Sequence, residues 1–179
     1  SSMLTPDMLA VLERQAIEVP SWAYGNSGTR FKVFSTPGTP RDPFEKIADA
    51  AQVHRYTALA PAVAIHIPWD RTPDYGVLGE FAKEHGVEIG TVNSNTFQDD
   101  VYKFGSLTHE DAAVRRQAID HHLECIDIMN QTGSRDLKIW LAEGSNYPGQ
   151  ADLRGRQDRL HESLQEIYAR LSGEQRLVL

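Results

Sequence analysis

A histidine near the end of a short apolar run is the first residue that could do chemistry. His66 lies in the run 62–67, which reads AVAIHI, and the chain continues through Pro68 and Trp69 to Asp70. Imidazole is the one side chain whose ordinary pKa suits proton transfer near neutral pH, so His66 is the candidate catalytic residue. The same position is also common for a histidine that is only hydrogen-bonded within a core. Asp70 could orient the ring, although the chain must first turn through Pro68.

Aromatic residues follow the predicted strands. All three tryptophans, Trp22, Trp69 and Trp140, come after short apolar runs, and Phe97 follows another. In parallel βα folds, ligands bind just beyond the carboxyl ends of the strands. Each tryptophan alone could pack beneath a loop. Their shared position favours a pocket in which aromatic faces meet the C–H surface of a small molecule such as a sugar, with amide and hydroxyl groups fixing its orientation.

The other motifs predict structure rather than chemistry. His121 and His122 are adjacent in a helical segment and lack the spacing of a zinc-binding pair, so we expect one to face the sheet and the other solvent. Cys125 lies on the apolar face of the same segment and should be buried and inert. Three arginines of a later helix alternate with aspartates and predict a solvated face: Arg154, Arg156 and Arg159. The sequence contains no P-loop, dinucleotide fingerprint or serine elbow.

These residues require a scaffold of alternating strands and helices. Apolar runs predict strands over 16–21, 62–67, 87–92 and 137–142, and 175–179 begins like a fifth. Helical patterns are expected over 3–15, after an Asp42 cap, from Pro73 to Gly86, from a Thr108 cap to Gly133, and from 153 to Gly173. This alternation is typical of βαβ units that share one parallel sheet.

The number of units sets the expected architecture. A complete eight-unit barrel needs about 250 residues, and the chain has 179. We therefore expect a single α/β domain over residues 1–179 that forms about the first half of a (β/α)8 TIM barrel and is truncated at the start of strand 5. Residues 1–3 are interpreted as a tag remnant.

Composition and charge narrow the class of partner. The formal net charge is -7, whereas surfaces that bind nucleic acid or anionic membranes concentrate lysine and arginine. No apolar run approaches the roughly 20 residues that a membrane span needs. Cys125 is the single cysteine, which is typical of a reducing compartment. These features predict a cytoplasmic protein with a small neutral ligand, no nucleic-acid partner and no membrane partner.

Eight short strings carry a family resemblance that extends from Val19 through nearly the whole chain. In order, they are VPSW, GTRF, IHIPWD, NSNTF, YKFGSLTH, LECI, IW and SNYPGQ. Read together at these spacings, they resemble the amino-terminal half of bacterial L-rhamnose isomerases, a group of broad specificity that is related to xylose isomerase. IHIPWD followed by NSNTF makes the resemblance specific.

The resemblance implies roles for individual residues. The histidine of HIPWD lies near the sugar's ring oxygen and anomeric hydroxyl in that family, which implies ring opening as the role of His66. Trp22, Trp69, Phe97 and Trp140 would line the substrate pocket. The phenylalanine of GTRF reaches into a neighbouring subunit's site, so Phe31 would cover a partner's substrate in a homo-oligomer.

The resemblance also implies a reaction and a cofactor. The family interconverts aldoses and ketoses, moving a hydrogen between C1 and C2 with the help of divalent ions, commonly manganese. Its metal ligands begin with a glutamate at the end of the fifth strand, so none is expected before Leu179, and the chain alone should bind no metal and be inactive. Two alternatives stay open: a ketose epimerase with the same barrel, and a self-associating half-barrel without catalysis.

Overall fold

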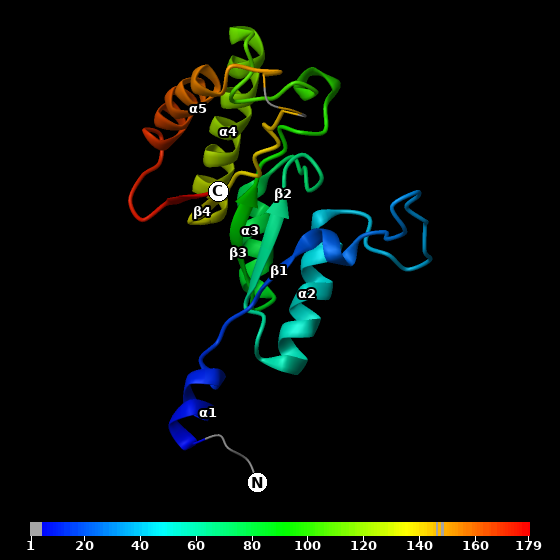
Figure 1. The fold of residues 1–179 in the computed structure, drawn as a ribbon. Helices are drawn as coiled ribbons and strands as arrows, with labels where there is room; N and C mark the ends of the chain where they lie inside the picture. The colour runs from blue at the N-terminus through cyan, green and yellow to red at the C-terminus, as the bar shows by residue number, and fades with distance from the viewer. Residues whose placement is uncertain (1–4, 146, 148) are drawn as a thin grey trace.

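A parallel five-stranded sheet forms the centre of the computed structural model, which describes residues 5–145, 147 and 149–179 (Figure 1). The strand order is β1-β2-β3-β4-β5, and every neighbouring pair is parallel. The strands are β1 (Glu18–Pro20), β2 (Ala62–His66), β3 (Glu88–Asn93), β4 (Asp136–Lys138) and β5 (Arg176–Val178). The predicted parallel βα architecture is confirmed.

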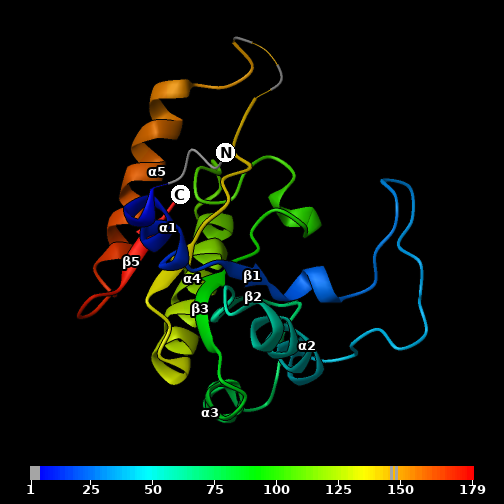
Figure 2. The same cartoon turned by 90° about the horizontal axis from the view of Figure 1, so that it is seen from below.

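Helices follow one another around the outer face of this sheet (Figure 2). Contacts join α2 to α3, α3 to α4 and α4 to α5. The helical elements are α1 (Pro6–Glu13), η1 (Ser21–Tyr24), α2 (Pro43–Thr57), α3 (Tyr75–Glu84), η2 (Asp100–Tyr102), α4 (Ala112–Thr132) and α5 (Leu153–Tyr168). Within the described residues, no helix is long and apolar enough to cross a bilayer.

The hydrophobic core lies between the sheet and these helices. Fully buried residues come from both layers, for example Ile65 of β2, Leu78 of α3, Met129 of α4 and Leu137 of β4. Each such side chain contributes about 1.5–3 kcal/mol through its removal from water. Because strand β2 is covered so completely, it reads as a continuous apolar run rather than an alternating one.

The N-caps confirm one prediction and correct another. The carboxylate of Asp42 accepts a hydrogen bond from the backbone N–H of Glu45 (2.9 Å), so α2 begins as predicted. In contrast, α4 is capped by Asp111, which accepts from the N–H of Ala113 (2.8 Å), and the predicted Thr108 cap is wrong. The hydroxyl of Thr108 donates instead to Glu143 (2.6 Å).

Several predicted boundaries were too wide. The first strand covers 18–20 rather than 16–21, because the chain enters η1 at Ser21. Helix α3 begins after an Asp74 cap instead of at Pro73, and α5 ends at Tyr168, before Gly173. Strand β4 ends at Lys138 rather than near residue 142, although Ile139 N–H still donates to the carbonyl of Val178 (2.9 Å).

Two segments project away from the sheet. All residues of α1 are exposed, including Leu9 and Leu12, and Figure 1 shows this helix set apart from the body of the molecule. The segment 25–42 extends from η1 as a long loop (Figures 1 and 2). The predicted helix over 3–15 is thus shorter, and its first two residues lie outside the described residues, as does the tag remnant proposed for residues 1–3.

A histidine is buried in the core. His122 is fully buried; its Nδ1 lies 2.6 Å from the carbonyl of Ala118 and its Nε2 lies 2.9 Å from Ser94 Oγ. A carbonyl can only accept, so Nδ1 carries the proton of the neutral ring. Burial lowers the pKa of His122 to about 4, outweighing the bond to Ala118. His121 is largely buried as well, which corrects the prediction that one of the two adjacent histidines faces solvent.

We expect acid to destabilise the chain through His122. Because the folded-state pKa lies below the unfolded value of 6.5, the unfolded state binds more protons between these values, and stability falls as the pH decreases from 6.5 through 4. The free energy of unfolding should drop by about 2 kcal/mol from this residue between pH 7 and pH 5. Urea titrations of His122→Gln should show a flatter pH dependence than the wild-type chain, whereas His161→Gln on the exposed face of α5 should retain the full slope.

Candidate functional site

The structure brings His66 and four predicted aromatic residues to one edge of the sheet. His66 is paired in register with Asn93, and Asn93 with Lys138, so the carboxyl ends of β2, β3 and β4 lie level with one another. An open cavity of about 490 Å³ lies beyond them. Its lining consists of Trp22, His66, Trp69, Asn93, Ser94, Phe97, Lys138, Ile139, Trp140 and Leu179.

Aromatic rings surround the imidazole of His66. Trp69 stacks on it with a centroid distance of 3.6 Å and an interplanar angle of 15°. Trp22 and Phe97 meet it edge to face at 5.5 Å and 6.2 Å, and Trp140 meets Phe97 at 4.6 Å. Trp140 remains 64% exposed and Trp69 44% exposed, so indole surface is available to a ligand. This mixed apolar and polar lining suits a small molecule that has both C–H faces and hydroxyl groups.

The imidazole of His66 is neutral at physiological pH. Burial lowers its pKa to about 4, although the charge of Asp70 acts in the opposite direction. Its Nδ1 is buried and has no hydrogen-bond partner among the described residues. A neutral imidazole can accept a proton from a hydroxyl group that reaches one of its ring nitrogens.

Asp70 does not orient the ring of His66. Its Oδ2 accepts hydrogen bonds from the backbone N–H of His66 (2.8 Å) and from Ser21 Oγ (2.5 Å). Its Oδ1 accepts from Lys46 Nζ (2.7 Å). The carboxylate therefore fixes the backbone at the end of β2, and the Asp70–ring pairing considered from the sequence is not formed.

A chain of hydrogen bonds from the loop after β3 and from α4 holds the indole of Trp69 in place. Trp69 Nε1 donates to Gln98 Oε1 (3.0 Å), which also accepts from Asn95 Nδ2 (2.8 Å). The backbone N–H of Asn95 donates to His121 Nε2 (3.0 Å), and burial lowers the pKa of this imidazole. His121 of α4 thus supports the loop after β3, and Gln98 supports the ring that stacks on His66.

Phe31 does not lie with the other predicted pocket residues. It is 80% exposed near the tip of the projecting segment 25–42, where Arg30 lies over its ring at 4.6 Å. A bridge between Gly28 and Val33 closes this tip. A Cβ on Gly28 would lie 2.0 Å from the carbonyl oxygen of Lys32, so the bridge requires glycine.

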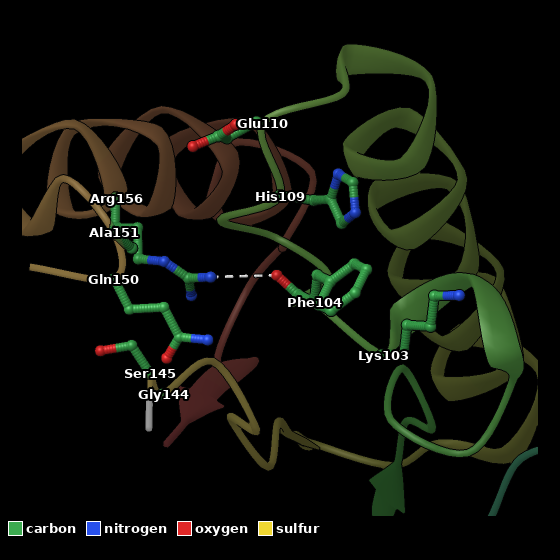
Figure 3. Close-up of a pocket in the computed structure, with 9 residues that line it drawn as sticks. All are labelled: Lys103, Phe104, His109, Glu110, Gly144, Ser145, Gln150, Ala151 and Arg156. Atoms are coloured by element: carbon green, nitrogen blue, oxygen red, sulfur yellow. Dashed lines mark hydrogen bonds between the residues drawn. The ribbon is translucent and has the colours of Figure 1, made fainter. Parts of the chain in front are cut away.

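A second cavity, of about 320 Å³, lies between the loop after β3 and the segment that leads into α5 (Figure 3). Its wall includes Phe104, His109 and Arg156, and the guanidinium of Arg156 donates to the carbonyl of Phe104 (3.0 Å). Arg159 donates to the carbonyl of Thr108 (2.7 Å). Arg156 and Arg159 therefore bind the loop 104–108, and the predicted solvated arginine face is wrong for these two residues.

Glu143 completes the fixation of this loop. It accepts hydrogen bonds from the backbone N–H groups of Ser106 (2.8 Å) and Leu107 (3.1 Å) and from the hydroxyls of Ser106 and Thr108. Burial raises the pKa of Glu143, but these hydrogen bonds outweigh it and leave the pKa below its ordinary value. Glu143 is therefore an ionised structural acceptor and not a free group at the aromatic cavity.

The described residues do not form a metal site. Within them, no three histidine, cysteine, aspartate or glutamate side chains lie close enough together to hold an ion. The two strand-end carboxylates are already engaged, Asp70 by Lys46 and Ser21, and Glu143 by the loop 104–108.

Sequence relatives of the chain are sugar isomerases by name. A probable sugar isomerase of Rhizobium meliloti (strain 1021) is 44% identical over 166 residues, and another of Mesorhizobium japonicum is 42% identical over 173 residues. The matches cover 90% and 94% of this chain but 39% and 40% of the relatives. The chain thus spans about two fifths of the length of these curated relatives. No family model matches it.

Solved structures show the same fold over about half of their length. The D-allulose 3-epimerase from Methylomonas sp. in complex with D-allulose has a TM-score of 0.62 at 15% identity and covers 92% of this chain and 50% of its own. An L-ribulose 3-epimerase has a TM-score of 0.59 at 15% identity, covering 91% of this chain and 48% of its own. The chain therefore has the architecture of a partial TIM barrel.

Proposed function

We propose that these 179 residues are the first half of a cytoplasmic aldose–ketose isomerase that converts L-rhamnose to L-rhamnulose or acts on a related aldose. The observation that carries this proposal is the neutral His66 imidazole enclosed by aromatic rings at the ligand-binding edge of the sheet. The names of the two relatives support a sugar as the substrate. On this proposal, the chain alone is inactive.

His66 would act in opening the sugar ring. The sugar's C–H face would lie against Trp22, Trp69 and Trp140, whose exposed surfaces line the cavity. A neutral His66 can accept the proton of the anomeric hydroxyl and return it to the ring oxygen as the bond between C1 and the ring oxygen breaks, which gives the open-chain aldehyde. Asn93 donates through Nδ2 to the carbonyl of Ile65 (3.0 Å), which fixes its amide at the cavity wall for a sugar hydroxyl.

The proposed assembly is a homo-oligomer. Phe31, which is exposed between the bridged residues Gly28 and Val33, would enter the site of a neighbouring subunit and exclude water there. Val33 and Phe34 of the same segment are exposed as well, and a cluster of exposed apolar side chains favours an interface with a partner.

Manganese would serve the complete protein. It supplies polarisation of the sugar oxygens when bound, and carboxylate and histidine ligands suit it. On this proposal, these ligands come from residues outside this chain.

The proposal is tested with the complete protein that contains this chain. Incubated with L-rhamnose and manganese, it should form L-rhamnulose, detected by chromatography of the sugars. A complete, manganese-loaded protein that interconverts no aldose and ketose would sink the proposal. Stoichiometric manganese and turnover in the 179-residue chain itself would contradict the assignment of the ligands to residues outside it.

A ketose 3-epimerase is the second candidate, because the solved structures that share the fold include several enzymes of that name. Product analysis separates the two reactions: an isomerase exchanges the carbonyl between C1 and C2, whereas an epimerase inverts C3 and leaves the ketose a ketose. The third reading, a self-associating half-barrel without catalysis, requires oligomers of the chain in sedimentation together with no turnover by the complete protein.

A further inference from the structure

A buried carboxylate joins three elements beneath the aromatic cavity. Asp70 is fully buried and lies between η1, α2 and the end of β2. It accepts from Ser21 Oγ at 2.5 Å, from the backbone N–H of His66 at 2.8 Å and from Lys46 Nζ at 2.7 Å. Ser21 and Lys46 lie 49 and 24 residues away in the sequence.

Two of these three hydrogen bonds end at the wall of the cavity. The donor Ser21 is fully buried and directly precedes Trp22, which lines the cavity. The other donor, His66, lines the cavity itself. The same oxygen, Oδ2, accepts both bonds, so the start of η1 and the end of β2 are held to one point. The rings of Trp22 and His66 meet directly above it, with centroids 5.5 Å apart.

We propose that Asp70 is a positioning residue that ties Trp22 to His66 and so fixes the edge-to-face contact of their rings at the cavity wall. The tie itself follows from the geometry alone, and its consequence for turnover rests on the proposed function. Asp70 touches no substrate on this proposal; it acts through the two side chains that do.

Lys46 has a separate task. A carboxylate without access to water is strongly disfavoured unless a cation compensates its charge. The side chain of Lys46 is 11% exposed and reaches Asp70 from α2, so its positive charge compensates the negative charge of the buried carboxylate. The hydrogen bonds from Ser21 and His66 fix the positions of these two residues, and Lys46 offsets the cost of burying the negative charge of Asp70.

Two variants separate these tasks. Ser21→Ala removes one hydrogen bond and keeps the ion pair, so the chain should fold while Trp22 loses its attachment. The double variant Lys46→Met, Asp70→Asn removes both charges, yet the amide oxygen of asparagine can still accept from Ser21 and His66. Asp127→Asn, on the exposed face of α4, is the matched control for a lost aspartate charge.

The spacing is measured by circular dichroism of the coupled indoles. Trp22 and Trp69 lie with centroids 6.1 Å apart, close enough for an exciton couplet, and Trp22→Phe assigns that signal. In the 179-residue chain, Ser21→Ala should lose most of the couplet, whereas the double variant and Asp127→Asn should keep it. A couplet that survives in folded Ser21→Ala, or disappears in the folded double variant, would overturn the proposed tie.

Turnover gives the second measurement. In the complete protein, Ser21→Ala should lower kcat/KM for the aldose roughly tenfold, since a small displacement of a positioned group is costly. The double variant Lys46→Met, Asp70→Asn, in which Ser21 is retained, should keep most of the wild-type kcat/KM. Equal turnover in Ser21→Ala and wild type would overturn the consequence for the reaction. A wild-type protein that shows the couplet but converts no sugar would instead refute the proposed function and leave the tie intact.

Discussion

Replacement of His66 by asparagine is expected to lower kcat/KM of the complete protein for L-rhamnose by about 100- to 10,000-fold. The neutral imidazole is the group in the aromatic cavity that can take up a proton, and asparagine cannot replace it in that role. The loss should be smaller for glyceraldehyde, an aldose too short to close into a stable ring, because His66 is proposed to act in ring opening. Steady-state kinetics with both aldoses measure this difference.

The control for this change is His161→Asn on the exposed face of α5, which should leave both rates unchanged. Urea unfolding of the two variants shows whether the fold is retained, since the stack with Trp69 is lost in His66→Asn. Equal losses for the ring-forming and the open-chain aldose would contradict ring opening as the role of His66. Such a result would place it in the later hydrogen transfer.

Replacement of Glu143 by alanine is expected to lower the free energy of unfolding by about 3 kcal/mol. The change removes the acceptor for the N–H groups of Ser106 and Leu107 and for the hydroxyls of Ser106 and Thr108. Buried donors that lose a charged acceptor cost more than the average hydrogen bond contributes. Urea unfolding measures the loss, and hydrogen exchange at the amides of Ser106 and Leu107 should become faster.

Glu80→Ala on the exposed face of α3 is the matched control and should change stability little. The free energy of unfolding of Glu143→Gln should lie between those of Glu143→Ala and the wild type, because the one amide oxygen of glutamine can accept some of these hydrogen bonds without the charge. Unchanged protection of the two amides in Glu143→Ala would show that Arg156 and Arg159 hold the loop without the carboxylate.

The arrangement of elements could be predicted from the sequence because local signals agree with the fold. A fully covered strand such as β2 has a continuous apolar run, and Asp42 with Pro43 marks the start of α2. The predicted helix boundaries are less accurate where two nearby residues could each serve as the N-cap. Thr108 and Asp111 both suit an N-cap, and the distant acceptor Glu143 engages Thr108, which the local sequence does not reveal.

The aromatic wall could be predicted for the same reason. His66 ends β2 and the four aromatic residues each follow a strand, and parallel strands bring their carboxyl ends to one edge. The residues that hold this wall in place could not be predicted from the sequence. Ser21, Lys46 and Gln98 reach their partners across 49, 24 and 29 residues, and Lys46 lies in an amphipathic helix where a lysine normally indicates a solvated face.

The strand order has a consequence for how the chain folds during synthesis. Each strand pairs with the next one in the sequence, so every βα unit finds its binding edge on the unit that left the ribosome just before it. Pairing with the preceding strand closes a shorter loop than pairing with any more distant strand would, which favours faster folding than other strand orders of a parallel sheet allow. The molecule can therefore be assembled in the direction of translation, one unit at a time, with β1 and β2 as the first template.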